Sequence, residues 1–99
     1  ARRAGDEWLY QSALGSLIRV LRDEPGGVVE ATSLVVERLA LTRSLRDPAA
    51  EAQALFQYAL LHQDRGEAGS AHDLYQQALA LAHRTGQPGL ARECEAPMR

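Results

Sequence analysis

Three histidines and one cysteine are the side chains in this sequence whose types could bind a metal ion or perform nucleophilic catalysis. His72 and His83 lie eleven residues apart in one predicted helix, which separates them by about 16 Å at 1.5 Å per residue. One zinc ion needs its ligands about 2 Å away, so this pair does not make a metal site. Cys94 is a lone thiol, and we find no glycine-rich phosphate loop, no nucleophile elbow and no carboxylate pair held by two elements. The sequence therefore predicts a protein that is not an enzyme and that carries no metal and no cofactor.

Composition and charge narrow the possible partners. The chain has 99 residues, of which 45% are hydrophobic and 24% charged, values typical of one folded domain. The net charge of −2 argues against a general attraction to nucleic acid or to anionic membranes. Arg38, Arg43 and Arg46 could form a basic edge, but acidic residues interleave with them and no aromatic residues accompany them. A solvated, partly ion-paired face is the favoured interpretation of these arginines.

Features linked to the membrane and to secretion are missing from the sequence. No apolar run approaches the roughly 20 residues of a membrane-spanning helix, and the first residues are too polar for a signal peptide. The single cysteine excludes an internal disulfide framework. These features predict a cytoplasmic protein without membrane contact.

A first helix is expected over residues 8–21, with Asp6 capping its N-terminus. Four of its apolar residues recur at i, i+3, i+4 and i+7, which places them on one buried face. They are Leu14, Leu17, Ile18 and Leu21. Trp8, at the start of the helix, would either anchor a partner or seal this end of the fold, and we favour sealing.

Further helices follow, separated by turn signals. They are expected over residues 28–45, 48–65 and 67–85. Pro25 and the two glycines after it end the first helix and reverse the chain. Asp47 is expected to cap the third helix, with Pro48 at its first position. Pro88 would open a fifth helix, which Pro97 ends.

The same helical spacing predicts which residues of these helices face inward. They are Ala31, Leu34, Val35, Leu39 and Thr42 in the second helix, Leu55, Tyr58, Ala59 and His62 in the third, and Ala71, Leu74, Tyr75, Ala78, Leu79 and Ala82 in the fourth. Ala59, Ala71 and Ala78 are small, so we expect the backbones of the third and fourth helices to come closest there.

An internal duplication with a period of forty residues organises the chain. The matched pairs are Gly26 and Gly66, Ala31 and Ala71, Val35 and Tyr75, Leu39 and Leu79, Ala40 and Ala80, Leu41 and Leu81, and Pro48 and Pro88. The first copy departs from the second at Arg38, which stands where Ala78 stands later. An arginine at a tight helix crossing is expected to extend out to solvent or to pair with a carboxylate such as Glu30.

The central hairpin resembles the tetratricopeptide repeat, whose signature places apolar, small and aromatic residues at fixed positions of a helix pair. The matching positions are Leu55, Tyr58, Ala59 and His62 on the first helix, Gly66 and Glu67 in the turn, and Ala71, Tyr75 and Ala78 on the second helix. Tyr58, His62 and His83 depart from the usual leucine, aromatic residue and proline. The forty-residue period resembles the long-repeat varieties of kinesin light chains and of bacterial regulatory arrays. In the first hairpin the resemblance makes Gly15 the expected close-packing site.

The resemblance implies an all-α, right-handed stack of antiparallel helical hairpins, forming one tetratricopeptide-like domain over residues 1–99. Repeat one would cover residues 6–47, repeat two residues 48–87, and a partial third pair residues 88–99. Two and a half repeats are few, because each repeat buries its apolar face mainly against its neighbours and about three are usually needed. We therefore expect the exposed ends to be covered by a second copy of the chain, by the rest of a longer chain or by another subunit.

The resemblance also implies a binding surface, because the inner surface of such stacks is formed mainly by the first helix of each pair. The matching positions are Leu9, Ser12, Ser16 and Arg19 in repeat one and Gln53, Phe56, Leu60, Gln63 and Asp64 in repeat two. Family members that clamp a peptide's terminal carboxylate carry lysine, asparagine and arginine on this face, so Phe56 and Leu60 argue against such a clamp. An apolar groove for a helix or an extended peptide is expected instead. The alternative is that these two side chains pack against the next repeat.

These expectations define two possible functions. The first is a non-enzymatic scaffold or adaptor that binds a protein or peptide partner and can associate with itself. The alternative is a domain that senses a ligand or a peptide within a larger signalling or transcriptional regulator.

Overall fold

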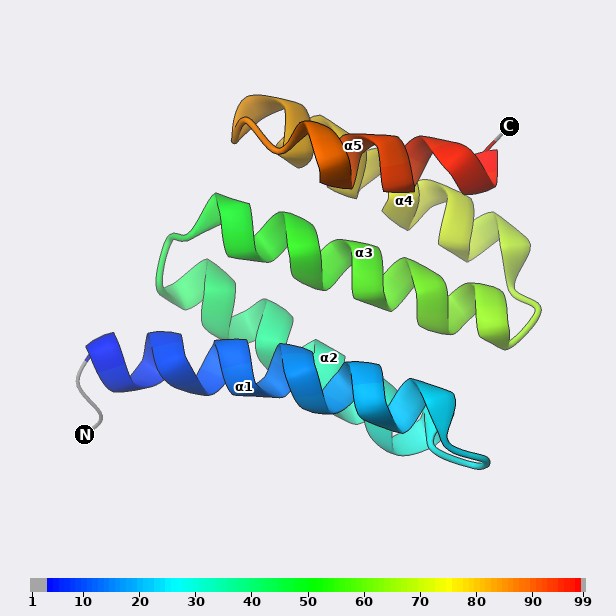
Figure 1. The fold of residues 1–99 in the computed structure, drawn as a ribbon, viewed down its shortest axis with the longest axis horizontal. Coiled ribbons are helices and arrows are strands. Elements are labelled where there is room, and N and C mark those ends of the chain that lie inside the picture. Colours follow the sequence, from blue (N-terminus) through cyan, green and yellow to red (C-terminus); the bar gives the residue numbers. More distant parts are fainter. Residues whose placement is uncertain (1–3, 99) are drawn as a thin grey trace.

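The computed structural model describes residues 4–98, which form five α-helices and a terminal turn of 3-10 helix, with no strand among them. The elements are α1 (Ala4–Asp23), α2 (Val28–Ser44), α3 (Pro48–Asp64), α4 (Ala68–Arg84), α5 (Pro88–Glu95) and η1 (Ala96–Met98). Consecutive helices run antiparallel (Figure 1). The predicted all-α fold is confirmed, while the outermost residues of the predicted domain, 1–3 and 99, lie outside the described part. None of the helices within residues 4–98 is long and apolar enough to cross a membrane.

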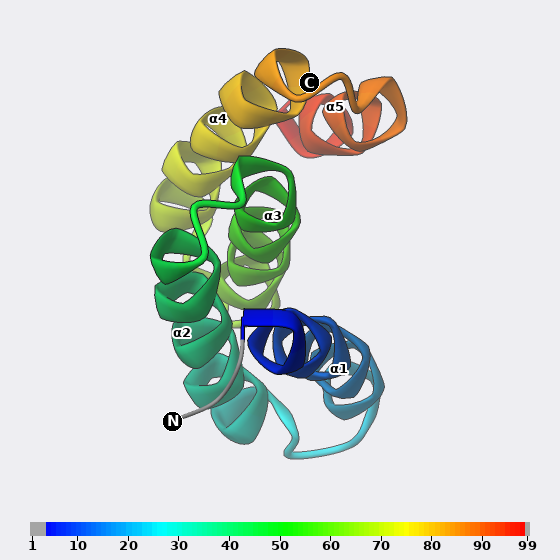
Figure 2. The same ribbon diagram turned by 90° about the vertical axis from the view of Figure 1, so that its left-hand side faces the viewer.

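The helices form two layers that curve into an arc (Figure 2). α2 and α4 make the outer layer, while α1, α3 and α5 make the inner layer with α3 in the middle. α3 packs most extensively on α4, and α2 packs on both α1 and α3. The concave side of the arc is therefore formed by α1, α3 and α5, which come from different hairpins.

Three of the interhelical loops repeat one hydrogen-bonding pattern at intervals of twenty residues. A backbone N–H just beyond each helix donates to the carbonyl of the residue five positions earlier. The residue immediately before the donor adopts a left-handed conformation. The donor and acceptor pairs are Asp47 and Thr42, Glu67 and His62, and Gln87 and Ala82, at 2.9 to 3.0 Å. The left-handed residues are Arg46, Gly66 and Gly86, with φ of 53°, 79° and 68°. Glycine adopts this conformation without strain, whereas Arg46 does not.

α1 differs from its predicted bounds at both ends. The helix begins at Ala4, so Asp6 lies in its first turn and not at the predicted cap position. An acidic residue is favourable at either position because both lie near the positive end of the helix dipole, which is why the sequence did not distinguish them. At the other end α1 extends to Asp23, and a Cβ on Gly27 would lie 2.0 Å from the carbonyl oxygen of Leu21. Only glycine fits the reversal into α2.

Asp47 joins the first hairpin to α3. It caps α3 as predicted, since its carboxylate accepts a hydrogen bond from the backbone N–H of Ala50 at 3.1 Å and Pro48 takes the first helical position. The other carboxylate oxygen accepts a hydrogen bond from the indole Nε1 of Trp8 at 3.0 Å. Trp8 therefore ties the start of α1 to the corner between α2 and α3, although it remains 49% exposed.

Two clusters of buried side chains form the core. The first joins α2, α3, α4 and α5, and the second joins α1, α2 and α3. The predicted inward-facing residues that are buried are Leu14, Ile18, Ala31, Val35, Leu39, Thr42, Leu55, Ala59, Ala71, Tyr75, Ala78 and Ala82. The predicted residues that are only half-buried are Leu21, Leu34, Tyr58, His62, Leu74 and Leu79. Leu17 alone among the predicted residues is exposed, at 45%, while Gln11 is buried instead. The buried face of α1 is centred on Leu14 and Ile18, and Leu17 lies about 100° around the helix from Ile18, at the edge of that face.

Candidate binding groove

A groove opens on the concave side of the arc, between α1 and α5 and over α3, and its cavity volume is about 510 Å³. The lining side chains come from all three inner helices and from one residue of α2. They are Ser12, Gly15, Ser16, Ile18, Arg19 and Arg22 of α1, Arg38 of α2, Gln53, Phe56, Gln57 and Leu60 of α3, and Leu90 and Glu93 of α5. The groove thus exists only because the two hairpins and α5 are stacked.

Most of the predicted binding residues line this groove, and three lie elsewhere. Those in the groove are Ser12, Ser16, Arg19, Gln53, Phe56 and Leu60. Leu9 is 63% exposed, but it lies nine residues, or two and a half turns, from buried Ile18 and so on the opposite face of α1. Gln63 and Asp64 lie outside the groove lining, and both bond to side chains of other helices.

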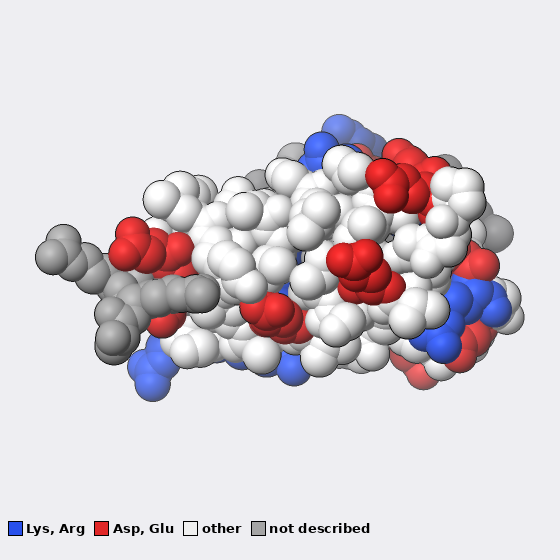
Figure 3. Space-filling model, turned by 90° about the horizontal axis from the view of Figure 1, so that it is seen from below, with Lys and Arg blue, Asp and Glu red and all other residues white. Residues whose placement is uncertain are grey.

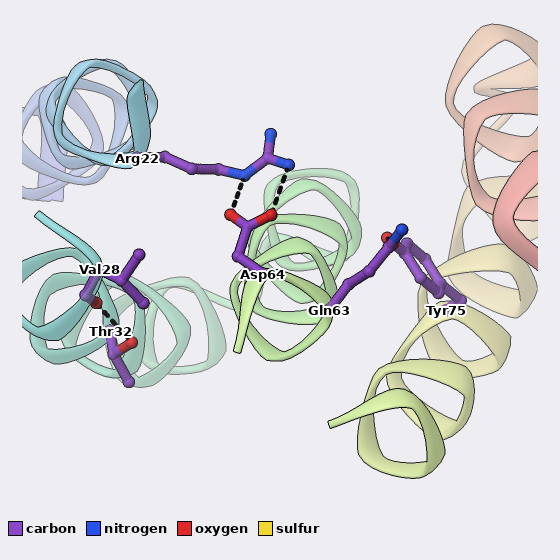
Figure 4. Close-up of polar contacts among 6 residues, drawn as sticks. All are labelled: Arg22, Val28, Thr32, Gln63, Asp64 and Tyr75. Atoms are coloured by element: carbon purple, nitrogen blue, oxygen red, sulfur yellow. Dashed lines mark hydrogen bonds and ion pairs between the residues drawn. The ribbon is translucent and has the colours of Figure 1, made fainter. Parts of the chain in front are cut away.

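Gln63 and Asp64 connect neighbouring helices. Arg22 donates from Nε and Nη2 to the two carboxylate oxygens of Asp64 at 2.6 and 3.1 Å, which joins α1 to α3 (Figure 4). This bond raises the pKa of Arg22 more than desolvation lowers it. On the other side of α3, Gln63 accepts a hydrogen bond from the hydroxyl of Tyr75 on α4. The last turn of α3 is therefore fixed from two directions.

Phe56, Leu60 and Leu90 form an apolar wall of the groove. All three are partly buried and pack against the first core cluster. The Phe56 ring also packs in a tilted arrangement against Tyr75, with the ring centroids 5.9 Å apart. The two interpretations of Phe56 and Leu60 are compatible, because these side chains pack against neighbouring helices and still face the groove.

The floor of the groove contains a buried arginine. Arg38 is 5% exposed, and its guanidinium is held by the side-chain oxygens of three glutamines. Nε donates to Gln11 at 3.1 Å, Nη1 to Gln57 at 2.7 Å and Nη2 to Gln53 at 3.3 Å. The prediction that Arg38 reaches solvent or pairs with a carboxylate such as Glu30 is therefore wrong, because neutral amide oxygens on α1 and α3 surround it instead.

Gly15 makes the room that Arg38 occupies. A Cβ on Gly15 would lie 2.8 Å from both Cζ and Nη1 of the Arg38 guanidinium, well inside the contact distance of non-bonded heavy atoms. The Gly15 carbonyl also accepts a hydrogen bond from Nε2 of Gln57 at 2.9 Å. The prediction of a close approach at Gly15 is confirmed, with the difference that a side chain rather than a helix backbone fills the space.

The polar network continues from the groove floor to the loop before α5. Nε2 of Gln53 donates to Oε1 of Gln87 at 3.0 Å. Nε2 of Gln87 in turn donates to the carbonyl of Ala49 at 3.1 Å and to the hydroxyl of Thr85 at 2.8 Å. Neutral amides on α1 and α3 therefore surround Arg38, and the loop residue Gln87 holds one of these amides, that of Gln53, in place.

The charge of Arg38 has no counter-ion among residues 4–98. Neither Arg38 nor Arg19 takes part in an ion pair within this range. Desolvation by burial lowers the pKa of Arg38, the charge of Arg19 lowers it further, and Asp47 opposes both with a smaller effect. An arginine remains protonated in proteins despite such influences, so the groove floor is permanently positive.

The histidines and the cysteine do not come together. Nδ1 of His62 lies 3.1 Å from Glu67, and its ring packs on Tyr58 with the centroids 4.7 Å apart. Cys94 is buried in the first core cluster. Burial raises the pKa of its thiol to about 11, and the charges of the glutamates on either side add to the increase. Within residues 4–98, no group of three or more histidine, cysteine and acidic side chains could hold a metal ion.

The outer side of the first hairpin carries apolar side chains that the rest of the described chain leaves exposed. They are Trp8, Leu9, Leu17 and Val20 on α1 and Val29 and Val36 on α2, each 45% to 80% exposed. On α1, Leu9, Ala13, Leu17 and Val20 recur at helical spacing along the face opposite Ile18. Figure 3, which views the molecule from this side, shows a surface made mostly of uncharged residues, with separate acidic groups across it and basic groups towards its edges.

Several groove residues were not predicted from the sequence as binding residues. They are Gly15, Ile18, Arg22, Arg38, Gln57, Leu90 and Glu93. A signal for Arg38 exists, since Gly15 offers space on the neighbouring helix and Gln53 and Gln57 place two amides one turn apart on the same face of α3. The sequence contains no comparable signal for Leu90, because the position of α5 over α3 depends on the packing of α4.

The fold and the groove together define an all-α stack of helical hairpins with a concavity on the side of α1, α3 and α5. No family model, no curated protein and no solved structure matches this chain.

Proposed function

We propose that this protein is a non-enzymatic interaction scaffold that binds a helix or an extended peptide of a protein partner. The observation that carries the proposal is the groove itself, a concavity of about 510 Å³ formed jointly by α1, α3 and α5. Grooves between packed helices receive an amphipathic helix or an extended segment, with apolar side chains as anchors. The tetratricopeptide-like pattern of the sequence implies a binding surface on the same helices.

The composition of the groove suits a peptide better than a wholly apolar ligand. Phe56, Leu60 and Leu90 supply an apolar wall. The NH2 groups of Gln53 and Gln57 each donate one hydrogen bond within the protein and keep a second N–H that can bind a backbone carbonyl. Ser12 and Ser16 keep the opposite rim open because both are small. We place this scaffold in the cytoplasm, where its single thiol would stay reduced.

A selection from a library of displayed random peptides of about ten residues, long enough to span a groove of this kind, tests the proposal. We expect the intact chain to enrich a family of related sequences. Ser12→Trp fills the groove from an exposed position and should weaken binding of the selected peptides about tenfold or more. Ser70→Trp makes the same change at an exposed position on α4 and is the matched control. Enrichment of no peptide, or equal binding to both variants, would refute the proposal.

The exposed stripe on α1 supports self-association as a second part of the proposal. Leu9, Ala13, Leu17 and Val20 form one apolar stripe along α1, so two copies of α1 can pack antiparallel about a two-fold axis with each stripe covering the other. The exposed residues of α5 include the charged Arg92 and Glu93, so the other end of the stack is more polar. A contact between two α1 helices therefore buries more apolar surface than a head-to-tail contact does.

Sedimentation equilibrium of the 99-residue chain tests this second part. We expect a dimer at tens of micromolar and dissociation in the variant Leu17→Glu, because a charge at the centre of the stripe would be buried without a partner. Gln77→Glu, an exposed change on α4 with the same added charge, should leave the dimer intact. A monomer for the unmodified chain across this range would refute self-association and leave the groove proposal standing.

A further inference from the structure

We infer that the floor of the groove is a carboxylate subsite, in which Arg38, with Arg19 beside it, binds an acidic side chain of the bound peptide. The inference rests on the proposed function, because it names the chemistry that the same groove would recognise in its ligand.

The first observation is a buried charge that the described protein does not neutralise. Arg38 is 5% exposed, and its acceptors are the neutral oxygens of Gln11, Gln53 and Gln57. Removing a cation from water without a counter-ion is unfavourable, and hydrogen bonds to neutral amides offset this cost only in part. A guanidinium has five N–H donors, and the three bonds in the structure leave two of them for a ligand.

The second observation separates the three arginines of the groove into two kinds. Arg22 is already paired with Asp64 in a bidentate contact. Arg38 and Arg19 have no such partner within residues 4–98. Both line the groove, and the charge of Arg19 lies near enough to lower the pKa of Arg38. One anionic group placed between the two guanidiniums would neutralise a repulsion that the free protein retains.

The number of free donors favours a carboxylate over a larger anion. A carboxylate accepts two parallel N–H bonds from one guanidinium, which equals the number that Arg38 has left. A phosphate monoester brings three acceptor oxygens and about −1.5 to −2 charges. The amide oxygens of Gln53 and Gln57 already face the guanidinium and would repel oxygens beyond those that Arg38 binds.

The rest of the groove orients the ligand around this contact. Glu93 lies on the α5 wall and repels a carboxylate there, so the acidic group of the ligand is directed towards α1. Phe56, Leu60 and Leu90 form the apolar part of the lining. The expected ligand is therefore a peptide in which aspartate or glutamate lies within a few residues of a large apolar side chain.

Peptides selected from the random library on the unmodified chain provide the probes, and fluorescence anisotropy measures their affinity. We expect the selected family to contain an acidic residue beside an apolar one. Replacing that glutamate by glutamine in a synthetic peptide should weaken binding to the unmodified chain about tenfold or more, the loss of one charge-assisted pair. Raising the salt concentration should weaken binding of the acidic peptide more than of the amide peptide.

Two protein variants locate the effect. Arg38→Gln should bind both peptides alike, because the group that distinguishes them is gone. Arg19→Gln changes an exposed residue and should weaken only the acidic peptide, by about threefold. This second variant keeps the test valid if Arg38→Gln does not fold. Arg84→Gln, an exposed change on α4 with the same loss of charge, should bind as the unmodified chain does.

The outcomes distinguish the inference from the proposal on which it rests. Enrichment of no peptide would refute the scaffold function itself. In a second outcome, the selected peptides bind Ser12→Trp more weakly than the unmodified chain, but replacing their glutamate by glutamine does not change their affinity. This outcome would support the scaffold function and refute the carboxylate subsite. Tighter binding of a phosphoserine peptide than of the glutamate peptide would also refute it, because the site would then be a phosphate site.

Discussion

The two helical hairpins of this chain solve the same packing problem in different ways. Both pair two antiparallel helices, and both place the second helix of the pair in the outer layer. In the α3–α4 hairpin the crossing is filled by Ala59, Ala71 and Ala78, which are at most 3% exposed. In the α1–α2 hairpin, Arg38 stands at the position of Ala78, opposite Gly15. One crossing is apolar and made of small residues, and the other encloses a cation.

The difference shows what a large polar residue requires inside a helix crossing. Arg38 is accommodated because Gly15 lacks a Cβ and because amides on α1 and α3 point at the guanidinium. Ala78 requires only that the residues around it stay small. In the first hairpin, the crossing residues Gly15 and Arg38 also line the groove. In the second hairpin, the crossing residues Ala59, Ala71 and Ala78 do not line it.

The largest expected effect is that of Arg38→Ala. The change relieves the desolvation of the guanidinium, but it leaves the buried amide oxygen of Gln11 without its donor and creates a cavity beside Gly15. We expect the second effect to be larger, so that the free energy of unfolding falls by about 3 kcal/mol. Urea unfolding followed by circular dichroism measures it. Arg19→Ala, an exposed change one helix away, should cost at most about 0.5 kcal/mol. Equal costs would mean that Arg38 is exposed in solution and that the two crossings do not differ in the way described.

A smaller effect is expected from placing a larger side chain in the apolar crossing of α3 and α4. Ala78→Leu adds three carbon atoms where Ala78 is 0% exposed, which should lower the free energy of unfolding by about 1 to 3 kcal/mol. Ala80→Leu makes the same change at an exposed position of α4 and should have little effect, as should replacement of the exposed Gln76. If Ala78→Leu and Ala80→Leu cost the same in urea unfolding, the α3–α4 crossing is not close-packed at Ala78.

The contrast between the crossings also marks how far the sequence could predict the structure. Helical spacing and turn residues predicted the helices and the buried faces of α2 and α4, because these depend on local periodicity and burial. The environment of Arg38 was not predictable in the same way, since its acceptors lie 27, 19 and 15 residues away in sequence. The groove was predicted in part. Its α3 wall follows from the repeat pattern, whereas the contribution of Leu90 depends on how α4 positions α5.

A third prediction tests whether Gly15 and Arg38 act as a pair. With Arg38 present, Gly15→Ala should destabilise the chain by about 1 to 2 kcal/mol, because the new Cβ would contact the guanidinium. In the Arg38→Ala background the same change should be neutral or stabilising by up to about 1 kcal/mol, since alanine is the better helix former. A double-mutant cycle in urea measures the coupling. The same cost in both backgrounds would show that the glycine serves another purpose than making room for Arg38.

The smallest expected effect lies in the loop between the two hairpins. Three of the four left-handed loop positions are glycine, and Arg46 is the exception with φ of 53°. A left-handed conformation costs an L-residue about 1 to 2 kcal/mol, while glycine costs about 0.5 to 1 kcal/mol through the entropy of the unfolded chain. Arg46→Gly should therefore stabilise the protein by about 0.5 to 1 kcal/mol. The reverse change at the matching loop, Gly66→Ala, should destabilise it by about 1 kcal/mol. Thermal unfolding measures both changes in stability. Changes of opposite sign for Arg46→Gly and Gly66→Ala would support one backbone geometry shared by the two loops. A loss of stability in Arg46→Gly would instead show that the Arg46 side chain stabilises the corner between α2 and α3.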